Sequence, residues 1–94
     1  MLRDRIGEAA LLELTAEECT ELAQACLKKA RSLRGDMPVA KTDGEMYNDI
    51  VEELADVRIC IAEVLNDTID ISDVARMELN KKERLLERLK TVKS

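Results

Sequence analysis

Helix-breaking residues are concentrated in one short stretch of this chain, residues 35–44, which holds two of the three glycines and the only proline. Glycine and proline interrupt regular structure more strongly than other residues, so this stretch is expected to be a loop between regular elements. The remaining composition is 37% charged and 46% apolar, with Tyr47 as the single aromatic residue. Sheets are instead rich in β-branched and aromatic residues. The sequence therefore predicts an all-α fold.

Apolar residues recur every three or four positions along the chain, which is the spacing of amphipathic helices. A chain of 94 residues is one domain's worth, and a domain of this size has a thin core that favours self-association. We predict a single four-helix, bundle-like domain over residues 1–94. Its helices are expected at about residues 2–12, 15–33, 42–66 and 72–92.

Several helix ends carry capping signals. Thr15 and Thr42 are each followed three residues later by a glutamate, which is the capping-box pattern at a helix N-terminus. Gly35 follows the basic end of the second helix and can adopt the left-handed conformation that ends helices. Asp70 or Ser72 is expected to cap the fourth helix.

The net charge of −5 comes from 20 acidic and 15 basic residues. A chain of this sign has no long-range attraction for nucleic acid phosphates or anionic lipids, so neither a nucleic acid polymer nor a membrane is expected as a partner. Residues 1–6 are not followed by the apolar segment of a signal peptide, and no apolar run approaches the roughly 20 residues that span a bilayer. A cytoplasmic protein is expected.

The chain has three cysteines, no CxxC pair and no histidine. This set excludes a disulfide framework and a zinc site, and the absence of histidine removes Ser-His and Cys-His nucleophilic schemes. Cys19, Cys26 and Cys60 lie on or beside apolar helical stripes, where a free cysteine behaves as a small hydrophobic residue.

One acidic pattern occurs twice, thirty-five positions apart, in residues 17–21 and again in residues 52–56. At 100° per residue, Glu18 and Glu53 lie at the edges of apolar stripes, about 90° and 70° from their middles. Glu21 and Asp56 follow one turn later. If the two stripes pack antiparallel, the acidic edges meet. The stripes comprise Cys19, Leu22, Ala23, Cys26, Ala30 and Leu33 in the second helix, and Met46, Ile50, Leu54, Val57, Ile61, Val64 and Leu65 in the third.

Either acidic motif alone is more simply a solvated helix face, because glutamate favours helices and their first turns. Four carboxylates that face each other repel strongly, so such a cluster is sensible only when cations fill it. Oxygen ligands without histidine or thiolate suit Mg²⁺ or Mn²⁺, and a magnesium-holding acidic cluster typically serves phosphate chemistry. Glu18 cannot both close the Thr15 capping box and bind metal, and we expect the metal role to prevail.

The fourth helix has charged residues, Glu78, Lys81 and Lys82, in the middle of its apolar stripe. Long lysine stems could simply cover the edge of a core. The alternative is that basic and amide side chains there bind phosphate or base, with a further lysine on the second helix. The candidate substrate-binding residues are Lys28, Arg76, Asn80, Lys81 and Arg84.

The doubled motif resembles the hallmark of the MazG-like, all-α nucleotide pyrophosphohydrolases, EExxE on one helix and ExxD on the next. The likeness covers about residues 6–90. It implies cleavage of a nucleoside triphosphate between the α and β phosphates, giving a nucleoside monophosphate and pyrophosphate. It also implies one or more Mg²⁺ ions and assembly as a homodimer or a dimer of dimers. By position it implies Glu18, Glu21, Glu53 and Asp56 as metal ligands, with Glu17 as a supporting or water-orienting catalytic group.

Family members often have a Lys-Asn-Arg set on the last helix, which Arg76, Asn80 and Arg84 resemble loosely. This chain has arginine at the first place and a one-residue shift at the last. Within the same fold a dUTPase or a phosphoribosyl-ATP pyrophosphatase is an alternative, although the latter usually has a histidine soon after its second motif. A non-catalytic helical dimerisation or regulatory module is the alternative from another class. The base and sugar are not identified, and Tyr47 is expected in a core or an interface.

Overall fold

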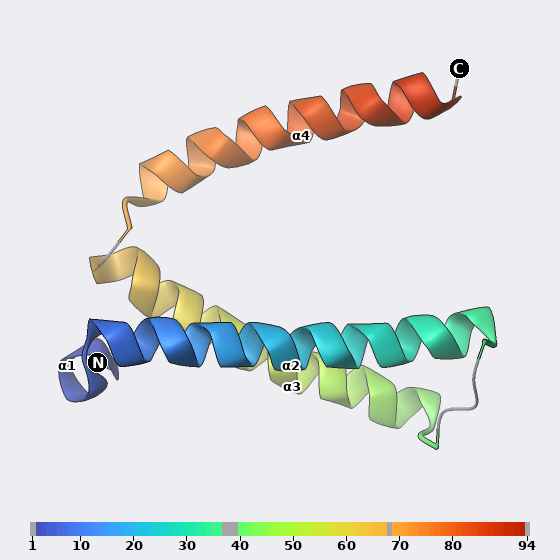
Figure 1. Ribbon diagram of the computed structural model, residues 1–94, viewed down its shortest axis with the longest axis horizontal. Coiled ribbons are helices and arrows are strands. Elements are labelled where there is room, and N and C mark those ends of the chain that lie inside the picture. The colour runs from blue at the N-terminus through green and yellow to red at the C-terminus, as the bar shows by residue number, and fades with distance from the viewer. Residues whose placement is uncertain (1, 37–39, 68, 94) are drawn as a thin grey trace. The chain divides into compact units, whose positions relative to one another are not determined.

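The computed structural model describes residues 2–36, 40–67 and 69–93, and within these ranges it is all-helical with no strand (Figure 1). The helices are α1 (Leu2–Ile6), α2 (Glu8–Arg34), α3 (Asp43–Asp67) and α4 (Ile71–Lys93). The predicted all-α class and the last two helices are confirmed. The chain divides into two compact units, residues 1–64 and residues 65–94. The single domain expected over residues 1–94 stays a prediction.

The boundary between the first two helices was predicted wrongly. Gly7 separates α1 from α2 with a φ of +84°, a backbone conformation that residues with a Cβ rarely adopt. Helix α2 then runs without a break through residues 13–15, where the sequence predicted the boundary between two helices. Thr15 is therefore not an N-cap: its hydroxyl donates to the carbonyl oxygen of Leu11 at 2.8 Å, the bond to residue i−4 that threonine makes inside a helix.

The other predicted caps are confirmed. Gly35 ends α2 in the left-handed conformation, with a φ of +70°. Thr42 and Glu45 form a reciprocal capping box: the Glu45 amide donates to Thr42 Oγ1 at 3.1 Å, and the Thr42 amide donates to Glu45 Oε1 at 2.9 Å. At α4 the cap is Asp70, whose Oδ1 accepts from the Ser72 amide at 2.8 Å.

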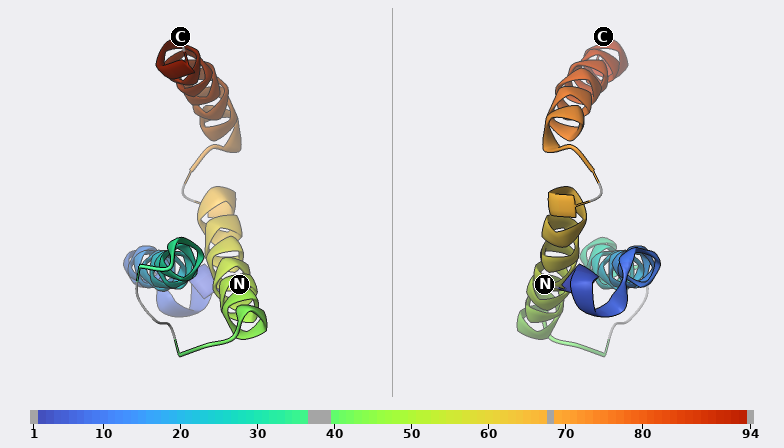
Figure 2. Two further views of the ribbon diagram at one scale, coloured as in Figure 1. Left: turned by 90° about the vertical axis from the view of Figure 1, so that its right-hand side faces the viewer. Right: turned by 90° about the vertical axis from the view of Figure 1, so that its left-hand side faces the viewer.

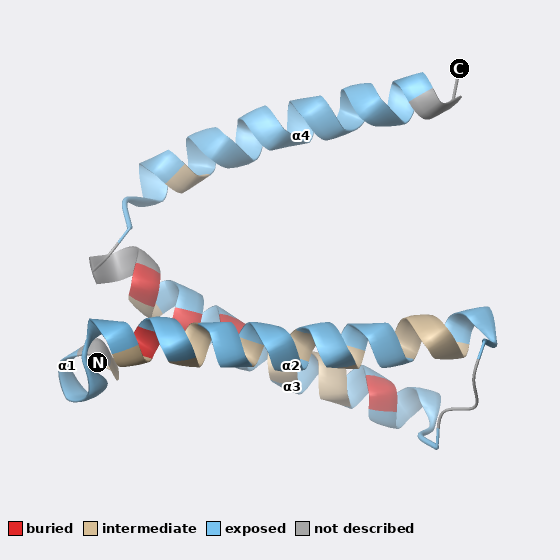
Figure 3. Ribbon diagram, in the orientation of Figure 1, coloured by how far each residue is buried: buried red, intermediate tan, exposed pale blue. Residues whose placement is uncertain are grey.

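Helices α2 and α3 lie side by side and run in opposite directions (Figures 1 and 2). The core between the first three helices is small, as Figure 3 shows, and many large apolar side chains are exposed. This agrees with the thin core expected from the length of the chain. The buried apolar residues are Leu11, Met46, Val57, Cys60 and Val64.

The side of α2 that packs against α3 is not the predicted apolar stripe. Its buried and half-buried residues recur at alternating spacings of four and three, and Glu18 lies in the middle of this row, not at its edge. The predicted stripe is mostly exposed, and Leu33 at its end is 74% exposed. The helix has apolar residues on two adjacent sides, and α3 covers only one of them. The packed row comprises Leu11, Thr15, Glu18, Leu22, Ala25 and Lys29.

The predicted stripe of α3 agrees better with the structure. Most of its described members are buried or half-buried, whereas Leu54 and Ile61 are 45% and 42% exposed. Leu65, like Val92 in α4, lies outside the residues whose side chains are described. Tyr47 is 66% exposed, so it does not lie in the core of this unit. The alternative position in an interface stays a prediction.

Helix α4 has only one half-buried residue, Val74, among its described side chains, and the others are exposed (Figure 3). The apolar residues Ile71, Leu85 and Leu89 are therefore unpartnered within this unit. Among the described residues, no helix combines the length and the apolar character needed to cross a bilayer.

Candidate metal centre

Three carboxylates from two helices meet in the first unit. Glu18 of α2 and Glu53 and Asp56 of α3 each offer one oxygen, and these three oxygens lie within 4.8 Å of one another. Ligand oxygens about 2.0–2.1 Å from an octahedral Mg²⁺ ion lie about 3–4 Å apart. Small side-chain rotations would therefore bring this group to the spacing of a cation site.

The local structure explains why these residues meet. Glu53 and Asp56 are one turn apart, so they share a side of α3. Glu18 points toward them because it lies in the middle of the packed row of α2. Thr15 makes its hydrogen bond to Leu11 instead of to the Glu18 backbone, so no capping box competes for the Glu18 side chain.

The surroundings of Glu18 and Glu53 disfavour their ionised forms. The pKa of Glu18 is raised, first by desolvation and then by the charges of Glu21 and Asp56. The pKa of Glu53 is also raised, first by desolvation, then by a hydrogen bond with Glu21, and then by the charges of the neighbouring acids. Clustered carboxylates hold their protons more strongly when no cation neutralises their charges.

Two of these carboxylates hold oxygens without partners. The Oε2 atoms of Glu18 and Glu53 are buried and have no hydrogen-bond partner among the described residues. A buried polar atom without a partner costs free energy, and a bound cation is a partner of the right charge. The donor set therefore fits a cation, and it fits one that prefers oxygen.

The remaining two acids of the predicted catalytic set lie nearby on α2. Glu21 is exposed, and it influences both Glu18 and Glu53, so it borders the cluster. Glu17 is exposed and points about 100° around the helix axis from Glu18. Of the four predicted ligands, the structure brings three within 4.8 Å and places Glu21 at their edge.

A hollow of about 210 Å³ opens beside the acids, and its walls come from α1, α2 and α3. Burial raises the pKa of the Cys60 thiol, although a hydrogen bond with Thr15 opposes this shift. Cys60 thus behaves as the small hydrophobic residue that was predicted, whereas Cys19 and Cys26 are exposed. The residues that line the hollow are Leu2, Leu14, Glu18, Asp56, Ile59 and Cys60.

Thr15, Cys60 and the apolar walls of this hollow were not among the predicted site residues. For Thr15, the signal that could have found it is the alternating four and three spacing of the packed row of α2, which starts at Leu11. A second apolar row on the same helix, which includes Cys19 and Cys26, obscured it.

The predicted substrate-binding residues are distributed over both units. Lys28 is exposed on α2, two turns or about 10 Å beyond Glu21. Arg76 forms an ion pair with Asp73 on α4. Lys81 lines a small surface hollow of α4. The roles of these residues stay predictions.

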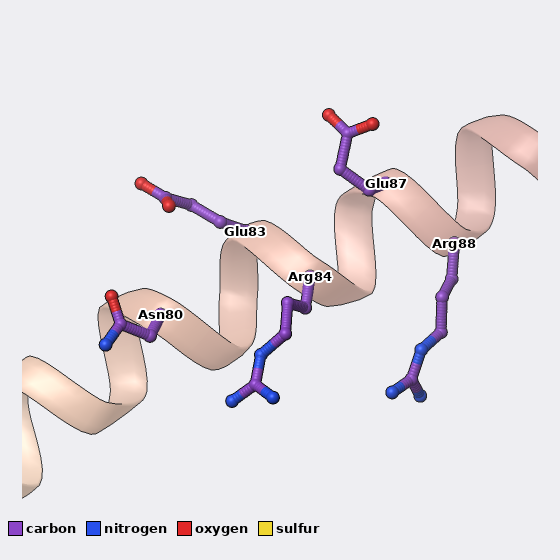
Figure 4. Close-up of a pocket in the computed structure, with 5 residues that line it drawn as sticks. All are labelled: Asn80, Glu83, Arg84, Glu87 and Arg88. Carbon is purple, nitrogen blue, oxygen red and sulfur yellow. The ribbon is translucent and has the colours of Figure 1, made fainter.

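Asn80 and Arg84 line another surface hollow of α4 (Figure 4). Figure 4 shows that Arg84 and Arg88 extend toward one side of the helix, whereas Glu83 and Glu87 extend toward another. One helix cannot enclose a ligand, so this hollow becomes a binding site only with further walls.

The fold and the acidic cluster together define an all-α protein with a candidate cation site between two antiparallel helices. Residues 7–89 match the family model of the MazG nucleotide pyrophosphohydrolase domain, and the chain belongs to this family of hydrolases. Both acidic motifs and the polar residues of α4 fall within the matched range. No curated protein and no solved structure matches the chain significantly.

Proposed function

We propose that this protein is a Mg²⁺-dependent pyrophosphohydrolase that cleaves a nucleoside or deoxynucleoside triphosphate between the α and β phosphates. The products are a nucleoside monophosphate and pyrophosphate. The observation that carries the proposal is the group formed by Glu18, Glu53 and Asp56 across two helices, with oxygens within 4.8 Å of one another. Membership of the MazG family supplies the reaction class.

In this proposal Glu18, Glu53 and Asp56 hold the cation, together with Glu21 at the edge of the cluster. A cation bound there would neutralise phosphate oxygens and lower the pKa of an attacking water. Glu17 lies beside the ligands on α2 and is proposed to orient that water or to support the ligands.

The donor set favours a hard cation. Cys60, which lines the hollow beside the cluster, has a raised pKa because it is buried, so it remains protonated at neutral pH and is a poor ligand. Only carboxylate oxygens are then available from the cluster. Mg²⁺, or Mn²⁺ in its place, is the ion that such a set prefers.

The substrate side of the proposal rests on cationic and amide groups that match a triphosphate and a base. Lys28 is the candidate within the first unit. The candidates on α4 are Arg76, Asn80, Lys81 and Arg84. We further propose that the protein acts in the cytoplasm. We also propose that it self-associates as a dimer or a dimer of dimers, because many large apolar side chains are exposed in each unit.

A nucleotide panel with product identification tests the proposed activity. Each triphosphate is incubated with the protein and Mg²⁺, and we expect a monophosphate and pyrophosphate from at least one of them. The Glu53→Gln variant should give no product, and chelation of the cation should stop the reaction. Release of single phosphate groups would contradict the proposed cleavage between the α and β phosphates.

The same panel separates the alternatives. Turnover of dUTP alone would identify a dUTPase of this fold. Turnover of phosphoribosyl-ATP alone would identify the corresponding pyrophosphatase. Absence of turnover with every nucleotide, from protein that binds Mg²⁺, would favour a non-catalytic dimerisation or regulatory module.

A further inference from the structure

Helix α2 carries a second apolar row, which α3 does not cover. We call this row the α2 seam. Its spacings alternate between three and four residues, which is the repeat of a helix that packs along a second helix. All its members are exposed except Ala30, which is half-buried, and Leu12 and Leu33 at its ends are 46% and 74% exposed. The α2 seam comprises Leu12, Ala16, Cys19, Ala23, Cys26, Ala30 and Leu33.

The α2 seam has the same order of residue types in both directions. Leucine stands at each end, alanine and cysteine alternate between, and Ala23 is the centre. A two-fold axis beside Ala23 would therefore place Leu12 opposite the partner's Leu33, and Cys19 opposite the partner's Cys26. The alanine and cysteine side chains are small, so the two helix backbones could approach closely.

The charges of α2 are separated along its length. All five acidic residues precede Leu22 and all four basic residues follow Ala23. Two copies of α2 in antiparallel orientation would bring each acidic half against a basic half, whereas parallel copies would bring like charges together. The acids are Glu8, Glu13, Glu17, Glu18 and Glu21, and the bases are Lys28, Lys29, Arg31 and Arg34.

The residues that flank the α2 seam also favour antiparallel over parallel pairing. In the antiparallel arrangement Glu13 follows Leu12 and lies next to the partner's Arg34, which follows Leu33. In a parallel pair, the flanking positions that meet across the interface are five residues apart. Glu8 would then face the partner's Glu13, and Lys29 would face the partner's Arg34. Charge complementarity therefore selects the antiparallel pair.

We propose that two copies of this chain associate through the α2 seam, antiparallel, about a two-fold axis beside Ala23. The inference rests on the self-association proposed above and names the surface and the direction of pairing. The α2 seam lies about 100° around the helix from Glu18, so this pairing leaves the acidic cluster uncovered. Each dimer carries two such clusters.

Disulfide cross-linking of this chain tests the direction of pairing. Under mild oxidation with diamide, the wild-type protein should give a covalent dimer through Cys19 and the partner's Cys26. Neither Cys19→Ser nor Cys26→Ser alone should cross-link, because each then presents serine opposite its remaining cysteine. An equimolar mixture of the two variants should cross-link again through one bridge.

Each other outcome of this experiment overturns the proposal. Cross-linking of both single variants would mean that identical cysteines face each other in a parallel pair. No cross-link in the wild-type protein or the mixture would mean that the two cysteines do not meet. Buried Cys60, 3% exposed, is common to all samples and serves as the internal control.

Two variants with matched charge test the surface itself. Ala23→Glu places two like charges at the proposed axis, one from each chain. The molar mass measured by light scattering should then fall by half, as each dimer separates into single chains. Gln24→Glu adds the same charge to the next residue, which is exposed but outside the α2 seam, and its mass should not change. Equal masses for both variants, with helicity retained, would overturn the proposed interface.

A charge exchange supplies an independent measurement. Glu13→Arg and Arg34→Glu should each weaken the dimer several-fold, and the double variant should restore the wild-type dissociation constant. A double variant no stronger than its parents would overturn the antiparallel pairing. The nucleotide panel measures turnover, which is a different property from pairing. A dimer formed through another surface would leave turnover intact, and an inactive protein could still pair through the α2 seam.

Discussion

Glu18 of α2 and Glu53 of α3 lie in one carboxylate cluster, and each holds a buried Oε2 atom that has no hydrogen-bond partner among the described residues. Desolvation raises the pKa of both side chains. In the absence of a cation, the two helices therefore bring together groups that oppose each other's ionisation. A bound proton or a bound metal ion relieves this charge repulsion, and the effects of both can be measured.

The first prediction concerns cation binding. Replacement of Glu53 by glutamine removes a negative charge from the cluster and should weaken Mg²⁺ binding by at least about tenfold, the lower bound for groups that merely support ligands. Helicity should not change, because the amide fits the same space. Calorimetric titration with Mg²⁺ and circular dichroism measure the two properties. The Glu52→Gln variant is the matched control, because Glu52 is exposed beside the cluster, and equal binding by both variants would refute the site.

The second prediction concerns pH. Because the pKa values of Glu18 and Glu53 are raised above 4.5 in the folded protein, the folded state binds more protons than the unfolded state between 4.5 and the raised values. The contribution of these two groups to stability therefore falls as pH rises through that window. Mg²⁺ should reverse this loss, so it should raise the melting temperature more at neutral pH than near pH 4.5.

Thermal melts followed by circular dichroism, with and without Mg²⁺, measure this effect. The pKa values of Glu45 and Asp70 are lowered by hydrogen bonds at the two helix caps, so their contributions are lost only as pH falls below the ordinary values. Glu53→Gln should remove part of the decline toward neutral pH. A melting temperature that responds to Mg²⁺ equally at every pH would contradict the prediction.

The third prediction concerns the start of α3. Thr42→Ala removes the hydroxyl that accepts from the Glu45 amide at 3.1 Å, and loss of a helix N-cap costs about 0.5–2 kcal/mol. Urea denaturation measures the change in the free energy of unfolding. Thr20→Ala is the control: the Thr20 hydroxyl donates only to the Ala16 carbonyl oxygen inside α2, so its loss should have little effect. Similar losses in both variants would mean that the capping box adds nothing.

The fourth prediction concerns substrate binding by α4. If Arg84 binds a phosphate, Arg84→Ala loses a charge-assisted hydrogen bond of about 1.5–3 kcal/mol. The expected result is a fall in kcat/KM of roughly tenfold to a hundredfold, mostly through KM. Arg88→Ala is the comparison, because Arg88 extends toward the same side of α4 (Figure 4) and was not assigned to the substrate. Equal effects of the two variants on kcat/KM would remove the assignment of Arg84.

Local signals in the sequence predicted a large part of the fold. The Thr42 and Glu45 box, the Gly35 cap and the Asp70 cap all involve residues within five positions of each other, so neighbouring residues suffice to form them. The doubled acidic motif is local in the same sense: an interval of three residues places Glu53 and Asp56 on one side of any helix.

The break at Gly7 was missed because Thr15 offered a capping-box pattern, whereas Gly7 starts α2 without a side-chain cap. A helix that continues through Thr15 keeps backbone hydrogen bonds that a break there would lose. Leu11 is fully buried in the structure. Its burial favours the continuous helix. Capping signals in the sequence carry no information about this packing.

The amino-acid sequence alone determined that this chain forms helices, where three of their caps lie, and that two of the helices carry matched acids at helical spacing. Only the tertiary structure decided which of two apolar rows of α2 meets α3, and therefore that Glu18 lies in the middle of the contact, across from Glu53. The physical reason is that periodicity reports which residues share a side of a helix, whereas the choice between two apolar sides depends on the surface that packs against them.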